Sequence, residues 1–180
     1  MDTYTKGNRF VSAYEKNFLA TSDVKRVIHN LNKKSELDTK IVGEISRSWM
    51  VATAGTFDNQ VELIGCRQAI PHSDMKYAGT IFITLSIIAK GLHMFRIDSG
   101  KLDVNASTEI NQHYYLCAGS LLIFDPSIPH MLYDDRSVGR NTAPEGWAAL
   151  QLIVDKRDFK AIKPENLANY VKRRFSAFLD

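Results

Sequence analysis

The stretch that decides the fold runs from Ala118 to His130 and reads Ala-Gly-Ser-Leu-Leu-Ile-Phe-Asp-Pro-Ser-Ile-Pro-His. Gly119 is typical of a turn, and the apolar run 120–124 is typical of a buried strand. Two prolines then stiffen a second turn, because the ring of proline fixes its backbone. The stretch therefore predicts turn, strand, rigid turn and a histidine that points back into the interior.

A second polar element lies upstream, at His72-Ser73-Asp74. Residues at i and i+2 of a strand point to the same face, so one metal ion could take both side chains. Two neutral imidazoles and one carboxylate on one face of an ion leave three coordination positions open, which is typical of catalytic non-haem Fe(II). We therefore predict that His72, Asp74 and His130 are metal ligands. Taken singly, His72 and Asp74 are ordinary turn residues, and His130 is an ordinary strand-end histidine.

Short segments rich in β-branched and aromatic residues follow one another from Trp49 onward, separated by Gly, Pro, Asp and Asn clusters. Regularly spaced short strands favour a sandwich or barrel over βαβ units. The expected strands are Trp49–Ala52, Val61–Ile64, Thr80–Ile88, Leu92–Ile97, Tyr114–Leu116, Ser120–Phe124 and Trp147–Val154.

The ends of the chain read as helices that flank this β-core. Residues 1–45 are expected to form a helical N-terminal support, in which Phe10, Tyr14 and Phe18 at i, i+4 and i+8 share one face. Ser22 and Asp23 are suited to cap a second helix. The core is expected over 46–155 and a C-terminal helix over 156–180, starting at Pro164 and Glu165 and burying Leu167, Tyr170, Val171 and Phe175.

Composition favours one domain over 1–180, since 180 residues at 44% hydrophobic suit a single core. The net charge of +3 is mild, so nucleic acid is not favoured as a partner, although Lys172-Arg173-Arg174 leaves it open. The two cysteines lack CxxC spacing, which favours a reducing, cytoplasmic setting. The sequence contains neither a membrane-spanning apolar run nor an apolar signal core, and it leaves the oligomeric state open.

At these residues the chain resembles the Fe(II)/2-oxoglutarate-dependent dioxygenases, whose signature is HxD followed by a distal histidine. The TIFITLSI run after the HxD is similar to that family's next core strand, and Gly119 to His130 resembles the GxxxxFxPxxPH unit of the wider cupin superfamily. The likeness covers about Val61 to Val154. It implies a mainly β double-stranded β-helix (jelly-roll or cupin-like barrel), with Fe(II), 2-oxoglutarate and O2 hydroxylating a small-molecule or side-chain substrate.

The family usually grips the far carboxylate of 2-oxoglutarate with a basic residue at the start of the last core strand. Trp147 stands about there in this chain. Arg140, ten residues beyond His130 (140 minus 130), is the preferred substitute, and the other candidates are Arg136, His93 and Arg96.

Two rival functions follow. A cupin-type metalloenzyme would use the same ligands without 2-oxoglutarate, and the missing strand-borne arginine supports it. A non-catalytic β-barrel binding module would carry a degenerate triad.

Overall fold

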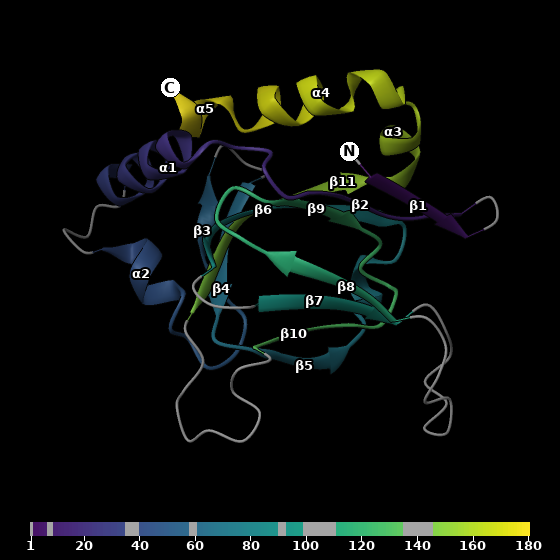
Figure 1. Ribbon diagram of the computed structural model, residues 1–180, viewed down its shortest axis with the longest axis horizontal. Helices are drawn as coiled ribbons and strands as arrows, with labels where there is room; N and C mark the ends of the chain where they lie inside the picture. Colours follow the sequence, from purple (N-terminus) through teal and green to yellow (C-terminus); the bar gives the residue numbers. More distant parts are fainter. Residues whose placement is uncertain are drawn as a thin grey trace.

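Two antiparallel β-sheets stacked face to face form the centre of the protein, seen in a computed structural model that describes residues 2–6, 9–34, 40–57, 61–89, 93–98, 111–134 and 146–180 (Figure 1). The larger sheet has the order β1 (Asp2–Lys6), β2 (Arg9–Glu15), β9 (Leu121–Phe124), β6 (Thr80–Ala89), β11 (Trp147–Asp155), β4 (Val61–Cys66) and β3 (Ala52–Phe57). The smaller sheet has the order β5 (Ala69–His72), β10 (His130–Asp134), β7 (His93–Asp98) and β8 (Asn111–Leu116).

The chain crosses between the two sheets in a regular way from β4 to β11. Strands β4, β6, β9 and β11 lie in the larger sheet, whereas β5, β7, β8 and β10 lie in the smaller one, and every pairing between neighbours is antiparallel. Eight antiparallel strands shared between two sheets in this way form a jelly roll. The mainly β double-stranded β-helix predicted from the sequence is therefore confirmed by the strand order.

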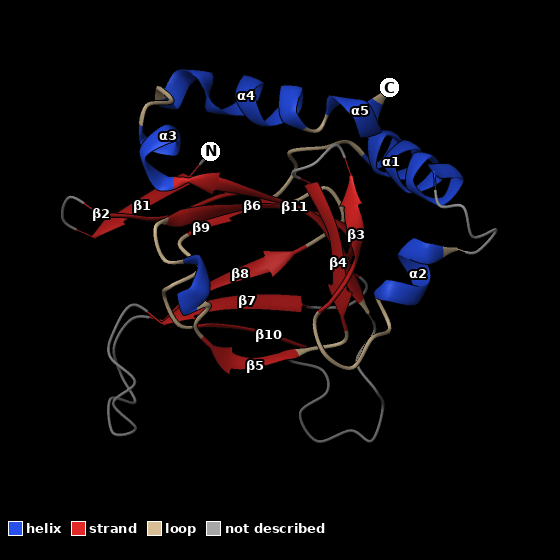
Figure 2. Cartoon of the chain, turned by 180° about the vertical axis from the view of Figure 1, so that it is seen from behind, coloured by secondary structure: helices blue, strands red, loops and turns tan. Residues whose placement is uncertain are grey.

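Helices cover the outer face of the larger sheet, and in the described part of the chain no α-helix lies over the smaller sheet (Figures 1 and 2). They are α1 (Thr21–Lys34), α3 (Lys156–Lys160), the 3-10 turn η3 (Pro164–Asn166), α4 (Leu167–Arg174) and α5 (Ser176–Leu179), with the short α2 (Ile41–Ile45) beside β3 and β4. Apolar residues of these helices and of the outer sheet face form one buried cluster, which includes Val27, Leu31, Val171, Phe175, Phe178, Leu85, Ile123 and Leu150.

The C-terminal segment is a scaffold, as its apolar stripe predicted. Leu167, Val171 and Phe175 are buried as expected, whereas Tyr170 is only half-buried. A 3-10 turn begins at Pro164, but the first helix of the segment, α3, already begins at Lys156. Backbone carbonyls of α5 accept hydrogen bonds from α1, with Asn30 Nδ2 at 3.0 Å from Phe178 O. None of the helices in the described part of the chain is long and apolar enough to cross a membrane.

The helix expected over the first fifteen residues is wrong, because this segment forms the β1–β2 hairpin. Strand β2 adds to the edge of the larger sheet through β9, so that Ala13 is buried among the helices while the neighbouring Tyr14 faces the other way. Period-two exposure of this kind belongs to a strand, and the open edge of β9 outweighed the helical spacing of the aromatic residues. The second helix is confirmed as α1, although it begins at Thr21, one residue before Ser22.

The expected strand Trp49–Ala52 is also wrong, since only Ala52 belongs to β3 and the strand runs on to Phe57. Trp49 and Met50 are exposed, so nothing in the sheet stabilises them as strand residues. Strands β5 and β10 were not among those expected, because each is short and each has a metal-ligand candidate at one end.

Gly119, at the turn into β9, adopts a positive φ of +93° that side chains rarely adopt. Its N–H donates to Ser86 O at 2.7 Å, and its carbonyl accepts from Leu19 N at 3.0 Å. A Cβ at this position would lie 2.5 Å from Leu19 O. The turn therefore requires glycine twice, once for its backbone angle and once for the close approach of the loop before α1.

We expect Gly119→Ala to lower the free energy of unfolding by more than about 3 kcal/mol, as the sum of left-handed strain and a backbone clash. Gly79 is a matched control, because its φ is +90° and a Cβ there meets nothing within 4 Å. Gly79→Ala should cost only about 1–2 kcal/mol, from strain alone. Urea unfolding of both variants measures the difference, and equal losses would contradict the close approach at Gly119.

Candidate metal centre

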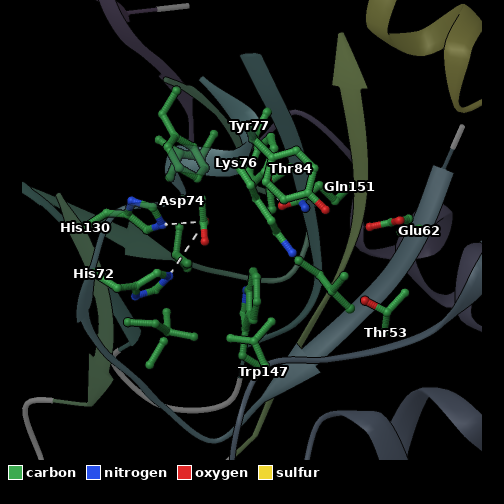
Figure 3. A pocket seen from close by; sticks show the side chains of 18 residues that line it. Thr53, Glu62, His72, Asp74, Lys76, Tyr77, Thr84, His130, Trp147 and Gln151 are labelled. Carbon is green, nitrogen blue, oxygen red and sulfur yellow. Dashed lines mark hydrogen bonds and ion pairs between the residues drawn. The ribbon is translucent and has the colours of Figure 1, made fainter. Parts of the chain in front are cut away.

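Three side chains from neighbouring backbone segments converge at one end of the space between the sheets (Figure 3). His72 is the last residue of β5, His130 is the first of β10, and Asp74 precedes the 3-10 turn η1 (Met75–Tyr77). Asp74 Oδ2 lies 3.4 Å from His130 Nε2 and 3.7 Å from His72 Nε2, and the three ligand atoms all lie within 4.8 Å of one another. The structure therefore brings together all three residues predicted as ligands.

A β-bulge in β5 sets the direction of His72. His72 pairs with His130, and Ala69 pairs with Leu132, so three steps along β5 match two steps along β10. The extra residue in one strand bends it and redirects the side chains beside it. The two imidazole rings consequently lie with their centroids 4.4 Å apart at 58°, on the same side of the pair.

The hydrogen bond from His130 to the backbone fixes which ring nitrogen faces the cluster. His130 Nδ1 lies 2.7 Å from Ile128 O, and a carbonyl can only accept, so Nδ1 carries the hydrogen. In the neutral ring the Nε2 lone pair then points at the carboxylate of Asp74. Two acceptors that face each other at this distance need a proton or a cation between them, which is how metal-binding histidines are oriented.

The backbone of Asp74 is held in place by two hydrogen bonds. Its N–H donates to Pro126 O at 2.8 Å, and its carbonyl accepts from Tyr77 N at 2.9 Å. When a proton rather than a metal ion lies between Asp74 and His130, the charged His130 ring donates a hydrogen bond that holds the pKa of the Asp74 carboxyl below its usual range against the opposing effect of burial, and the charges of His130, His72 and Lys76 act in the same direction. An ionised carboxylate is the form that binds a cation.

The turn before His130 is fastened to the helical segment that follows β11. Asp125 Oδ1 accepts hydrogen bonds from Ser127 N at 3.0 Å and Ser127 Oγ at 2.7 Å, and its Oδ2 accepts from Lys156 Nζ at 2.5 Å. Asp125 is buried, which alone would raise the pKa of its carboxyl, but these hydrogen bonds and the Lys156 charge lower that pKa overall. The loop that carries His130 is therefore locked by a largely buried ion pair.

A cavity of about 270 Å³ extends from the three side chains between the sheets. Its walls are mostly apolar and come from the inward faces of both sheets, with Trp147 at the start of β11. Trp147 Nε1 donates to Ser86 Oγ at 3.0 Å, so the residue that stands near the family's arginine position is a buried, hydrogen-bonded wall residue. A cavity of this kind beside convergent polar groups is the usual form of a small-molecule site.

Of the four residues predicted to hold a co-substrate carboxylate, two lie outside the described residues and two lie in β7. Arg136 and Arg140 lie outside the described residues. His93 and Arg96 lie in β7, the neighbour of β10, but their side chains are not among those described.

Several cavity residues escaped the sequence reasoning. Lys76, two positions after Asp74, is the one Lys or Arg among the described residues that line the cavity. Glu62, Thr84 and Gln151 also line it, each on a strand whose neighbouring residues are apolar. Such isolated polar residues in an apolar strand were the available signal, because a buried polar group needs a partner.

The chain is weakly similar to several solved structures and to no known sequence family. No family's sequence profile matches the chain, and no curated protein matches it in sequence. Among solved structures, AviO1 from Streptomyces viridochromogenes Tue57 matches at 12% identity and a TM-score of 0.48, over 86% of this chain and 92% of AviO1. Iron-bound EctD from S. alaskensis matches at 12% and 0.39, over 85% of this chain and 60% of EctD. The non-heme alpha ketoglutarate dependent epimerase SnoN from nogalamycin biosynthesis matches at 13% and 0.37, over 86% and 65%. The chain thus spans less than two thirds of EctD and SnoN.

We expect Lys156→Met to lower the free energy of unfolding at neutral pH by about 1–3 kcal/mol, because it leaves the Asp125 carboxylate buried without its cation. The folded-state pKa of Asp125 is lowered. The stabilising effect of the ionised Asp125 carboxylate is therefore fully present above the ordinary carboxyl pKa of about 4. It is lost as the pH falls through the lowered pKa of the folded state.

The loss of unfolding free energy caused by Lys156→Met should accordingly become smaller as the pH falls from neutral to below the lowered pKa of Asp125. Urea unfolding of wild type and variant at a series of pH values measures this. Arg157→Met is the control, since Arg157 is exposed and pairs with the exposed Asp155. Because solvent screens an exposed ion pair, this substitution should leave the free energy of unfolding nearly unchanged. A Lys156→Met loss that is the same at neutral and strongly acid pH would contradict the ion pair.

Proposed function

We propose that the protein is a non-haem Fe(II) and 2-oxoglutarate-dependent oxygenase that hydroxylates a substrate held in the cavity between the sheets. The observation that carries the proposal is the convergence of His72, Asp74 and His130, with His130 Nε2 facing the Asp74 carboxylate. Two nitrogens and one oxygen on one side of an ion leave the opposite side for a co-substrate and O2.

The donor set fits a single ion of this class. Ligand atoms about 2.1 Å from a common metal lie about 3 Å from one another in a facial arrangement. The separations from Asp74 Oδ2, 3.4 and 3.7 Å, are slightly wider, and small rotations of half-buried side chains close such a gap. The backbone hydrogen bonds to Asp74 and His130 hold two of the three ligands in place.

When bound, the Fe(II) centre would supply the coupling of 2-oxoglutarate decarboxylation to substrate oxidation by O2. The chain's own residues hold the geometry and exclude water. The inward aromatic residues Phe82, Phe124 and Trp147 line the cavity as an apolar wall, and Phe124 packs edge-on against the His130 ring with centroids 5.0 Å apart. An apolar wall lowers the local dielectric and so strengthens charge interactions beside it.

The carboxylate of 2-oxoglutarate that lies away from the metal would need a cationic side chain in the cavity. Arg140 remains our first candidate, with Arg136, His93 and Arg96 behind it. Lys76 joins them, because its side chain lines the cavity close enough to Asp74 to affect the carboxyl pKa.

The alternative is a cupin-type metalloenzyme that does not use 2-oxoglutarate, favoured by Trp147 at the start of β11. A turnover assay for succinate separates the two functions. A substrate that is oxidised without 2-oxoglutarate by the metal-loaded protein would favour the alternative.

We expect one Fe(II), Mn(II) or Zn(II) per chain and a loss of affinity of more than about 100-fold in His130→Ala, since changes to residues that merely orient ligands already cost about 10- to 100-fold. Calorimetric titration of the metal-free protein measures this. His29→Ala is the control, because His29 is exposed on α1 and should leave the affinity unchanged. Equal metal affinity in wild type and His130→Ala would overturn the metal centre.

We expect the metal-loaded protein to bind 2-oxoglutarate, and Arg140→Met to weaken binding by about tenfold or more, because a charged hydrogen bond is worth about 1.5–3 kcal/mol. Lys76→Met, tested in parallel, shows whether that cation is the anchor instead. Arg173→Met, on the exposed side of α4, is the charge-matched control. No binding at millimolar 2-oxoglutarate would move the assignment to the cupin-type alternative.

A further inference from the structure

Three polar side chains form a row across the inner face of the larger sheet. Glu62 on β4 is opposite Gln151 on β11, and Gln151 is opposite Thr84 on β6. All three line the cavity. In Figure 3, Glu62 and Gln151 lie on the side of the cavity away from His72 and His130, with Lys76 and Trp147 in the space between. The row therefore marks a second end of the cavity, distinct from the metal-ligand candidates.

Glu62 is in an unusual position for a carboxylate. It lies on a strand between β3 and β11, and its neighbours Val61 and Leu63 are buried beneath the helices on the other face. Its own side chain is half-buried, and no hydrogen-bond or ion-pair partner for it is found among the described residues. The Glu62 carboxylate is therefore available to pair with a cationic group that enters the cavity.

Gln151 is an independent observation at the same end. Its exposed fraction is 8%, and its Oε1 accepts a hydrogen bond from the Thr84 hydroxyl at 3.3 Å. The other end of the amide has no partner among the described residues, although it is more than nine-tenths buried. A hydroxyl can both donate and accept, so Thr84 can bind the amide either way round and Gln151 can turn its oxygen toward a ligand.

The charges in the cavity decide which ligand fits this end. A carboxylate beside Glu62 would be repelled, so the distal carboxylate of a co-substrate belongs elsewhere, near Lys76 or the candidate arginines. A protonated amine would give Glu62 a counter-ion and would place its N–H groups against the carboxylate and amide oxygens. The surrounding walls, which include Trp147 and Ile64, suit the apolar part of the same molecule.

We propose that the cavity end formed by Glu62, Gln151 and Thr84 binds a protonated amine on the substrate, so that the substrate is an organic cation whose apolar part extends toward the metal-ligand candidates. This inference rests on the proposed function only in treating the cavity as a substrate site. It names the substrate class and makes Glu62 the residue that selects it.

The test compares two probes of equal size, benzylamine and benzyl alcohol, which differ in whether they carry a positive charge. Binding to the full-length chain is measured by NMR titration near neutral pH, first as purified and then with Zn(II) added. The wild-type protein should prefer benzylamine by about tenfold, or 1.4 kcal/mol. Glu62→Gln keeps the size of the side chain and should remove this preference, while the affinity for benzyl alcohol stays the same and reports an intact cavity.

Glu165→Gln is the matched control, since Glu165 is exposed in η3 and the substitution changes net charge equally. It should keep the amine preference. Equal affinity of wild type for the two probes, no benzylamine binding at millimolar concentration, or a preference that survives in Glu62→Gln would each overturn the proposal.

These outcomes are separate from those of the proposed function, because no turnover is measured. Glu62-dependent amine binding without succinate formation would support the cationic site and count against the 2-oxoglutarate chemistry. Succinate formation without an amine preference would do the reverse.

Discussion

The antiparallel pairing of β5 with β10 is the constraint on which the rest of the centre depends. Residues directly opposite each other in such a pair have Cα atoms about 5 Å apart, and here those residues are His72 and His130. The third residue, Asp74, is tied to the same place by its backbone hydrogen bond to Pro126 in the turn that leads into β10. The backbone thus positions the cluster, so the conformational entropy of ordering these side chains is lost during folding and not when a ligand binds.

The sequence was sufficient for those features that have local causes. The glycine-strand-proline-histidine unit predicted a turn and a buried strand, because turns and strand periodicity depend on neighbouring residues. The convergence of His72, Asp74 and His130 was predicted instead from their types as metal ligands. The amphipathic spacing of Leu167, Val171 and Phe175 likewise predicted a supporting C-terminal helix. The turn, the strand and the helix each depend on residues a few positions apart.

Features that depend on distant pairing were not predictable in the same way. The aromatic residues near the N-terminus have helical spacing, yet the segment becomes a strand because it pairs with the open edge of β9. The sequence of residues 1–15 alone does not indicate that this edge is available. The row of Glu62, Gln151 and Thr84 comes from three strands up to 89 positions apart (151 minus 62), and only the sheet register brings it together. Lys76 escaped attention because a lysine after a turn is normally solvated.

The position of β5 at the outer edge of its sheet affects how the molecule meets other copies of itself. An outermost strand presents unpaired backbone groups that another chain can join, and a centre built there risks self-association. Pro71 stands next to His72 and has no N–H to offer, and the bulge beside it interrupts the flat ladder that an incoming strand would need. The same irregularity that aims His72 inward therefore also makes this edge a poor template for aggregation.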